Sequence, residues 1–198
     1  LVGGRTDGLH RRQPFASFNK KNNNTELTVL DLKKDKVWKK SILTLPAALA
    51  EQLQSSNMEF FQQGNQLVII GGYGYSETQK DHITHPAITS IKVKELINAI
   101  INQQDILPFM DQLTDERMAV TGGRLNMIGH LFYLIGGQRF EGRYNPHGPD
   151  HGPGFTQSYT NEIRRFHINT TGERVRIENY AAIRDSQLLH RRDYNLLA

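Results

Sequence analysis

The sequence predicts an all-β fold in which a unit of about four antiparallel strands occurs three times. The first observation is a short apolar run that ends on two glycines, at residues 131–137 and 66–72 and, without its beginning, at residues 1–4. The first glycines of these pairs, at positions 3, 71 and 136, are 68 and 65 residues apart. The second observation is the alternation of polar and apolar residues around these runs, which indicates half-buried strands. One supersecondary unit at near-constant spacing is the signature of a repeat architecture.

The first unit covers residues 1–45 and is predicted to supply strands 2 to 4 of the repeat. Residues 1–4 are interpreted as the end of a strand. Residues 26–32 alternate polar and apolar side chains, and residues 37–43 resume as a strand after a lysine-rich turn. This pair is predicted to be a hairpin.

The second unit covers residues 56–113. Before it, residues 46–53 open with a proline and place two leucines four residues apart, which predicts two helical turns. Residues 94–103 carry apolar side chains on one face at helical spacing and predict a second helix. The residues after the glycines, 73–85, are predicted to be a loop. The predicted strands of this unit are residues 58–63, 67–70, 87–93 and 106–113.

The third unit covers residues 116–185, and residues 188–198 are expected to form the first strand of a further unit. A long connection, residues 138–158, is dense in glycine and proline. A connection of this length without secondary structure is uncommon unless it is functional or disordered. The predicted strands of this unit are residues 118–125, 130–135, 159–168 and 173–184.

The predicted strands amount to three blade equivalents of a β-propeller. Four strands per unit with short connections are typical of propeller blades, and rings close with about four to eight blades. Three blades cannot form a ring, so we expect further blades or a second copy of the chain to complete it. The glycines allow a sharp turn where neighbouring blades converge, because glycine adopts a positive φ at little cost. An ordinary hairpin bend at each glycine pair is the alternative.

The residues that carry the repeat also point to a family. In the first unit Gly3-Gly4 is followed by Val29-Leu30-Asp31 and by Trp38, and in the third unit Gly136-Gly137 is followed by the polar-aromatic stretch 159–163. This pattern resembles the kelch repeat. The second unit departs from it, because its fourth strand has no tryptophan and the unit carries an inserted helix. The resemblance implies a single partial kelch-type β-propeller domain over residues 1–198, with about three four-stranded blades and a short inserted helix.

The resemblance also implies a binding face. In the kelch family, the loops from strand 2 to strand 3 and from strand 4 to strand 1 emerge on one side, which is the usual binding surface. Arginines in such loops bind carboxylates and phosphates in bidentate fashion, and tyrosines offer flat apolar area with a polar tip. The alternative is that these loops are polar because they are solvated. The candidate ligand-binding residues are Arg5, His10, Arg12, Tyr73, Arg139, Arg143, Tyr144, His147, Asp150, His151 and Arg191.

The predicted function is a binding module that recognises an acidic peptide or an anionic glycan through this loop face. The resemblance allows an alternative, a sugar-modifying enzyme of the mutarotase or oxidase kind. Its candidate residues would be those of the long connection, namely Arg139, Arg143, His147, Asp150 and His151. No nucleophile elbow, phosphate loop or dinucleotide fingerprint is present, so no residue is assigned as catalytic.

Composition narrows the function classes further. The chain has 198 residues, no cysteine and a net charge of +4, which excludes disulfides and thiolate metal sites. No run of lysine and arginine has the length of a nucleic-acid patch, so nucleic acid is not expected as a partner. The two histidines around Asp150 match no metal motif, and no metal or cofactor is expected. No apolar run is long enough to span a membrane. A bacterial envelope or extracellular location is favoured slightly over the cytoplasm.

Overall fold

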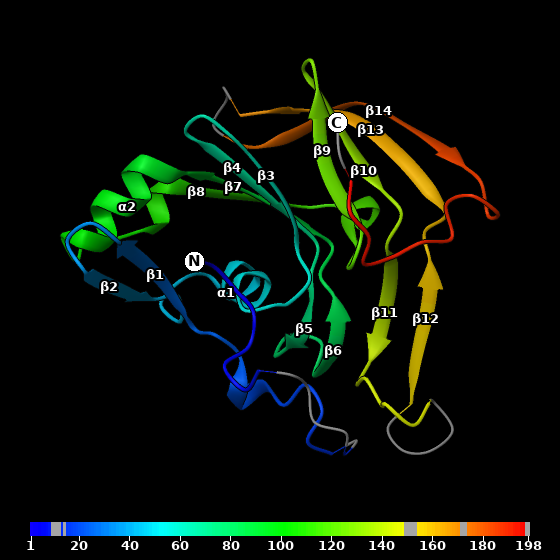
Figure 1. Ribbon diagram of the computed structural model, residues 1–198, viewed down its shortest axis with the longest axis horizontal. Helices are drawn as coiled ribbons and strands as arrows, with labels where there is room; N and C mark the ends of the chain where they lie inside the picture. Colours follow the sequence, from blue (N-terminus) through cyan, green and yellow to red (C-terminus); the bar gives the residue numbers. More distant parts are fainter. Residues whose placement is uncertain (9–12, 14, 149–153, 171–173, 197–198) are drawn as a thin grey trace.

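The computed structural model describes residues 1–8, 13, 15–148, 154–170 and 174–196. Within these residues the chain is mostly β, with fourteen strands in five antiparallel sheets and two α-helices. Two of the sheets are four-stranded, and none closes into a propeller (Figure 1). Neither described helix is long and apolar enough to cross a membrane.

The first unit contains a two-stranded sheet rather than the three strands expected. Strands β1 (Glu26–Asp31) and β2 (Lys36–Ser41) pair as the predicted hairpin. Residues 1–4 are not a strand, but the backbone of Leu1 pairs with that of Thr28. The amino terminus donates to the Thr28 carbonyl oxygen at 2.7 Å, and the Thr28 amide donates to the Leu1 carbonyl oxygen at 3.1 Å. The prediction of a strand end therefore survives only as this one pair of bonds.

The second unit is a four-stranded sheet with its strands in the order β3-β4-β7-β8. Helix α1 (Ala47–Leu53) precedes it, and helix α2 (Val93–Ile101) connects β7 to β8, so both predicted helices are confirmed. The described residues thus contain two α-helices, whereas the kelch resemblance implied a single inserted helix. The strands of this sheet are β3 (Glu59–Gln63), β4 (Gln66–Ile70), β7 (Ala87–Lys92) and β8 (Met110–Thr114).

The third unit repeats this plan with the order β9-β10-β13-β14. Its strands are β9 (Arg124–Ile128), β10 (Leu131–Ile135), β13 (Glu162–Asn169) and β14 (Arg176–Arg184). The prediction of a strand over residues 118–125 was wrong. A 3₁₀ turn at Glu116–Met118 comes first, and the strand begins only at Arg124. The cause is Gly122, whose φ of +68° breaks any extended run through this segment.

The two connections predicted as loops each contain a hairpin, which is a further correction. The hairpin β5 (Tyr73–Ser76) and β6 (Asp81–Thr84) lies between β4 and β7. The hairpin β11 (Gln138–Gly142) and β12 (Phe155–Tyr159) lies at the same place in the third unit, between β10 and β13. The two hairpins stand side by side below the large sheets (Figure 1). Three of the four residues of β5 are buried, so the strand shows no alternation that the sequence could reveal.

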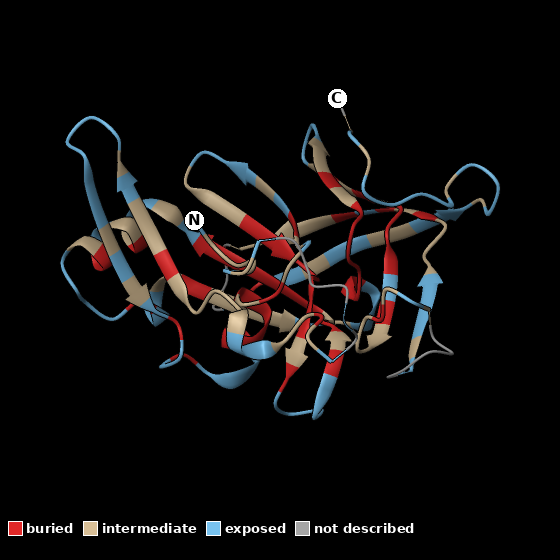
Figure 2. Cartoon of the chain, turned by 60° about the horizontal axis from the view of Figure 1, so that its bottom comes forward, coloured by how far each residue is buried: buried red, intermediate tan, exposed pale blue. Residues whose placement is uncertain are grey.

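The apolar core lies between neighbouring units. One cluster joins Leu27 and Ile42 of the first unit to Leu53 of α1 and Ile91 of β7. A second cluster joins the second unit to the third through Ile70, Ile88, Val120, Leu134 and Phe166. In Figure 2 the buried stretches gather in the interior between the sheets, whereas the hairpin tips are exposed. Each unit therefore buries its apolar face against the next unit, as expected of a repeat protein.

The glycine pairs form the junctions between units. The amides of Gly4 and Gly72 donate to the carbonyl oxygens of Ser55 and Val120, each at 2.9 Å, and the amide of Gly137 donates to that of Arg191 at 2.8 Å. The first glycine of each pair lies against the same oxygens. A Cβ atom would lie 2.9 Å from the Ser55 oxygen at Gly3 and 2.8 Å from the Arg191 oxygen at Gly136, and it would overlap the Val120 oxygen at Gly71. The close approach of the next unit therefore requires glycine at these positions.

A second repeated contact lies beside each junction. Asn57, Gly122 and Asp193 open successive units, and all three have a left-handed backbone, with φ values of +52°, +68° and +52°. The Gly122 amide donates to the Asn57 carbonyl oxygen at 3.3 Å, and the Asp193 amide donates to the Gly122 oxygen at 2.7 Å. Equivalent residues of three consecutive units are thus linked to one another by their backbones. The junctions therefore share one backbone geometry, although the connections of the units differ in length.

Candidate functional site

The connections that follow the three glycine pairs meet on one side of the molecule. Phe18 of the first connection contacts the ring of Tyr73 in the second, with centroids 5.1 Å apart, and that of Tyr144 in the third at 5.7 Å. The Tyr73 hydroxyl donates to the Gly142 carbonyl oxygen at 2.7 Å and accepts from the Tyr144 amide at 2.9 Å. Burial raises the pKa of this hydroxyl above its usual value, so Tyr73 stays neutral. Segments far apart in the sequence are therefore held together by one aromatic cluster.

Polar contacts fix the same arrangement. The Thr84 hydroxyl at the end of β6 donates to the Phe140 carbonyl oxygen at 2.8 Å and accepts from the Phe140 amide at 2.7 Å, which joins the two hairpins. The His82 Nε2 atom lies 2.7 Å from the Phe18 carbonyl oxygen. Burial lowers the pKa of His82, so its neutral ring donates this bond from Nε2. The hairpin β5–β6 thus bridges the first connection and the third.

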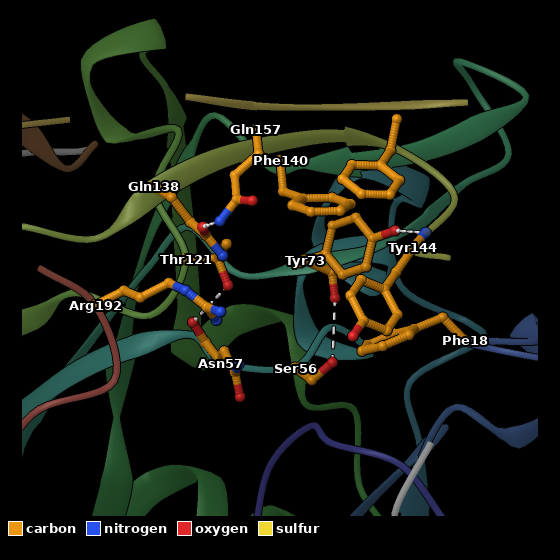
Figure 3. Close-up of a pocket in the computed structure, with 11 residues that line it drawn as sticks. Phe18, Ser56, Asn57, Tyr73, Thr121, Gln138, Phe140, Tyr144, Gln157 and Arg192 are labelled. Atoms are coloured by element: carbon orange, nitrogen blue, oxygen red, sulfur yellow. Dashed lines mark hydrogen bonds between the residues drawn. The ribbon is translucent and has the colours of Figure 1, made fainter. Parts of the chain in front are cut away.

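A cavity of about 290 Å³ opens against this cluster (Figure 3). One of its walls is aromatic, and Figure 3 shows the rings of Tyr73, Phe140 and Tyr144 packed there. The opposite wall carries hydroxyl and amide side chains from the segments that open the second and third units and from the hairpin β11–β12, together with Arg192. The lining residues are Phe18, Ser56, Asn57, Tyr73, Thr121, Gln138, Phe140, Tyr144, Phe155, Gln157 and Arg192.

The polar wall keeps hydrogen-bonding capacity for a ligand. The Gln157 amide donates to the Gln138 side-chain oxygen, which leaves the Gln138 amide nitrogen and the Gln157 oxygen without a bond to the described residues. The Asn57 side chain likewise makes no bond to the described part of the chain. Its backbone oxygen accepts from the Thr121 hydroxyl at 3.1 Å. Both donor and acceptor groups are therefore present on this wall, and they come from two successive units.

Arg192 places a positive charge at the rim of the cavity. Its Nε atom donates to the Tyr159 hydroxyl at 3.3 Å, and its Nη1 atom donates to Asp193 at 2.8 Å. The bond to Tyr159 and the charge of Asp193 raise the pKa of Arg192 further above its usual value. The Nη2 atom makes no hydrogen bond to the described residues. Arg192 is the one cationic side chain among the described residues that line the cavity, so an anionic group of a ligand would meet it there.

Three of the predicted arginines are used inside the fold. Arg5 is almost buried and binds Asp7 at 2.8 Å, and Arg143 donates to the carbonyl oxygens of Ser17 at 2.9 Å and Phe15 at 2.5 Å. Arg139 forms ion pairs with Glu116 at 2.7 Å and with Glu141 at 2.6 Å. Arg143 thus ties the third connection to the first, whereas Arg5 and Arg139 bind partners within their own units, and none of the three lines the cavity.

The other predicted residues divide between the cavity and its surroundings. Tyr73 and Tyr144 line the cavity. Arg191 is exposed and donates from Nη1 to the His190 carbonyl oxygen at 2.9 Å, whereas its neighbour Arg192 reaches the cavity. The His147 amide donates to the side-chain oxygen of Asn145 at 3.0 Å in the loop after β11. The candidates His10, Arg12, Asp150 and His151 lie outside the described residues.

Sequence reasoning missed most of the polar wall. Ser56 and Thr121 both stand fifteen residues before the first glycine of their unit, and each pairs by its backbone with the first residue of a hairpin, Tyr73 or Gln138. That constant offset of fifteen residues is the sequence pattern that could have pointed to both positions. Gln157 had no such signal, because it reaches the cavity only through the pairing of β12 with β11.

The chemistry available at the cavity is recognition by shape, stacking and hydrogen bonds. Among the described residues that line it there is no carboxylate and no imidazole. No group of three histidine, aspartate, glutamate or cysteine side chains that could hold a metal ion occurs in the described ranges. No protein-family model matches the sequence, and no curated protein matches it either. The resemblance to the kelch repeat therefore stands on the residues quoted above.

Proposed function

We propose that the chain is a binding module, part of a kelch-type propeller, and that the cavity between its connections takes an acidic sugar unit of a glycan. The observation that carries the proposal is the cavity itself, with an aromatic wall from three connections facing an amide and hydroxyl wall from the unit junctions and the hairpin β11–β12. The lining residues come from three units, with Phe18 in the first, Tyr73 in the second and Phe140 in the third. The site therefore depends on the arrangement of the repeat rather than on one loop.

The propeller part of the proposal is supported by the junctions. Three consecutive units are joined by the same hydrogen bond from the second glycine, at Gly4, Gly72 and Gly137. A constant junction between similar sheets generates a constant rotation, which is how blades are arranged around a propeller axis. The meander order of the two four-stranded sheets also fits a blade. The common rotation would place the connections of all units on one face.

The sugar part of the proposal follows from the chemistry of the two walls. Sugar rings have apolar faces that pack on aromatic rings, and the hydroxyls at their edges need donors and acceptors close together. Tyr73, Phe140 and Tyr144 supply the apolar area, and Asn57, Gln138 and Gln157 supply the amides. A volume of about 290 Å³ lies at the lower end of the range of about 300–1,000 Å³ for ligand pockets. It suits one sugar ring rather than a folded peptide segment.

The proposal that the sugar carries an acidic group follows from Arg192. The arginines Arg5, Arg139 and Arg143 are neutralised or used within the fold, so they do not make the face broadly anion-binding. Arg192 donates from Nη1 to Asp193, and its Nη2 atom, which bonds to no described residue, is left to donate to one carboxylate of a ligand. An acidic peptide with several charges finds a single cationic partner among the described lining residues. We therefore favour the glycan over the peptide.

An enzyme of the mutarotase or oxidase kind has less support. General acid–base catalysis needs titratable groups within hydrogen-bond reach of the reacting atoms. The described lining residues offer two tyrosines and an arginine but no carboxylate or imidazole. No observation on the described residues favours catalysis over binding.

The proposal is tested by following the side-chain amide signals of Asn57 and Gln138 by NMR while sugars are added. D-glucuronate should shift both signals with a dissociation constant of about 1 mM, a typical strength for a single small contact surface. Gln138→Ala should weaken this binding at least fivefold. The matched control is Gln79→Ala, which removes an exposed glutamine outside the cavity. If neither glucuronate nor a panel of other mono- and oligosaccharides shifts these signals, the proposal is wrong.

A further inference from the structure

Strands β1 and β2 of the first unit correspond residue by residue to β7 and β8 of the second. The Ile42 amide, directly after β2, donates to the carbonyl oxygen of Thr25, directly before β1, at 3.0 Å. In the second unit the Asp115 amide, directly after β8, donates to the oxygen of Pro86, directly before β7, at 2.8 Å. Counting from these two bonds gives each residue of one strand pair its equivalent in the other.

The equivalents of Val29 and Trp38 in the first unit are Ser90 and Asp111 in the second, and each two face each other across their strands. Val29 and Trp38 pack on the apolar cluster between the first and second units. Ser90 and Asp111 instead line a hollow of about 180 Å³ between the second unit and the third. The second unit therefore has a polar hollow at the place where the first unit has its tryptophan.

Four polar side chains of the second sheet line this hollow. Gln66 of β4 lies opposite Lys92 of β7. Ser90 stands two residues before Lys92 and lies opposite Asp111 of β8, so all four side chains are on one face of the sheet. The Gln66 amide donates to the Ser90 hydroxyl. The Val175 amide of the third unit donates to Asp111 Oδ2, which fixes the carboxylate at the junction of the two units.

Lys92 and Asp111 bring opposite charges to the hollow without pairing with each other. Lys92 is exposed at its rim, and its ammonium group makes no ion pair or hydrogen bond within the described part of the chain. The Asp111 Oδ1 atom likewise makes no bond to the described residues. The two residues are diagonal neighbours on β7 and β8, a relation in which Cβ atoms lie about 7–8 Å apart. A ligand with one positive and one negative group can therefore bind between them.

A second hollow of about 160 Å³ adjoins the first, and the two share Gln66 and Thr170. One wall of the second hollow is aromatic, because it contains Phe61 and Phe132, whose ring centroids are 5.9 Å apart. Aliphatic side chains of β4 and β13 complete this wall. The pair of charges in the first hollow thus lies beside an apolar surface in the second.

We propose that the two hollows bind a free α-amino acid with a large apolar side chain. Its ammonium group binds Asp111, its carboxylate binds Lys92, and its side chain enters the second hollow against Phe61 and Phe132. A free amino acid carries both charges on one carbon atom, as the spacing of Lys92 and Asp111 requires, whereas the terminal charges of a peptide are farther apart. The proposal goes beyond the sugar cavity, because the described linings of the two sites share no residue.

The first experiment changes the ligand and needs no altered protein. Titration calorimetry with the full chain should give a dissociation constant of about 1 mM or lower for L-phenylalanine. Phenethylamine lacks the carboxylate, 3-phenylpropionate lacks the ammonium group, and L-alanine lacks the large side chain. Each of these three compounds should bind at least tenfold more weakly than L-phenylalanine.

The second experiment changes the two charged residues. Lys92→Gln should weaken L-phenylalanine binding at least tenfold, whereas Lys94→Gln, at an exposed lysine outside both hollows, should change it less than twofold. Asp111→Asn should also weaken binding at least tenfold, although an asparagine oxygen can still accept the Val175 amide. Its control is Asp105→Asn, because the exposed Asp105 likewise accepts a backbone amide and lines neither hollow.

Three results would overturn the proposal. The first is no binding of L-phenylalanine up to about 10 mM. The second is binding that survives both Lys92→Gln and Asp111→Asn, or that is equally tight for phenethylamine and 3-phenylpropionate. The third is loss of L-phenylalanine binding in Arg192→Gln, because the amino acid would then occupy the sugar cavity. The proposal predicts that Arg192→Gln binds L-phenylalanine as the native chain does.

Discussion

The Tyr73 hydroxyl donates a hydrogen bond to the Gly142 carbonyl oxygen, 2.7 Å away, although 69 residues separate the two in the chain. The same hydroxyl accepts from the Tyr144 amide at 2.9 Å. One side chain of the second unit thus satisfies two backbone groups of the third. The contact holds the aromatic wall of the cavity against the hairpin β11–β12, so the shape of the cavity depends on it.

Tyr73→Phe should lower the free energy of unfolding by about 1–3 kcal/mol, because it leaves two partly buried backbone groups without a partner. Urea denaturation followed by circular dichroism measures the change. Tyr133→Phe is the control, since the structure shows no hydrogen bond from the Tyr133 hydroxyl to the described residues, and it should change stability by less than about 0.5 kcal/mol. Equal losses in the two variants would contradict the role of Tyr73.

Gly71→Ala should destabilise the chain by more than about 3 kcal/mol. The added methyl group would overlap the Val120 carbonyl oxygen of the next unit, and the residue also has a φ of +64°. Gly64→Ala separates the two effects, because Gly64 has a φ of +57° with nothing within 4 Å of an added Cβ. The left-handed backbone alone costs about 1–2 kcal/mol. Thermal unfolding of both variants measures the difference. Similar losses of stability in the two variants would show that the junction has room for a methyl group at Gly71.

Glu59 should make stability fall as the pH rises. Burial raises the pKa of its carboxyl to about 8, although Arg124 opposes the shift. The folded state therefore keeps a proton that the unfolded state releases near pH 4.5. The stabilisation is complete below about pH 4.5 and is lost as the pH rises through 8.

The pH dependence is best measured between pH 7 and pH 8. His85, whose pKa is lowered to about 4 by burial, is then largely neutral in both states and adds little. The free energy of unfolding of the native chain, from urea denaturation, should decrease over this interval by at most about 1.4 kcal/mol per pH unit. Glu59→Gln should remove the decrease. A parallel decrease in Glu59→Gln would assign the effect to another group.

The arginines predicted from the sequence should differ in their effect on stability. Arg143→Ala removes two bonds to carbonyl oxygens of the first connection, at Ser17 and Phe15, and should cost about 1–3 kcal/mol. Arg139→Ala removes ion pairs of a side chain that is 45% exposed, and such surface pairs contribute about 0–1 kcal/mol. Chemical denaturation of the two variants tests this order. A larger loss of unfolding free energy for Arg139→Ala than for Arg143→Ala would contradict the roles assigned to the two arginines.

The repeat was predictable from sequence because its markers are obligatory. Gly71 and Gly136 cannot carry a Cβ atom beside the carbonyl oxygen of the next unit, so the glycine pairs recur. The strands β4 and β10 in front of them are apolar on both faces and stand out as runs. The hairpin β5–β6 could not be predicted in the same way, because β5 is buried along most of its length and contains a glycine.

The candidate site was predictable in its location but not in its composition. The resemblance directed attention to the connections after the glycines, and Tyr73 and Tyr144 do line the cavity. Arg143 was assigned to a ligand, yet its partners are carbonyl oxygens 126 and 128 residues away, a distance that no local pattern encodes. Asn57 is left-handed and reaches the cavity because of the junction geometry, which becomes visible only in three dimensions.

The proposed function requires that the cavity binds an acidic sugar and that Arg192 donates hydrogen bonds to its carboxylate. The most direct measurement compares the dissociation constants of D-glucuronate and D-glucose, which differ by one carboxylate, for the native chain and for Arg192→Gln. Charge-assisted hydrogen bonds contribute about 1.5–3 kcal/mol, so the native chain should prefer glucuronate at least tenfold. Arg192→Gln should abolish this preference while glucose binding is retained, and Arg176→Gln, at an exposed arginine of β14, should leave it unchanged. Equal binding of the two sugars by the native chain would contradict the assignment of Arg192, and binding of neither would contradict the site.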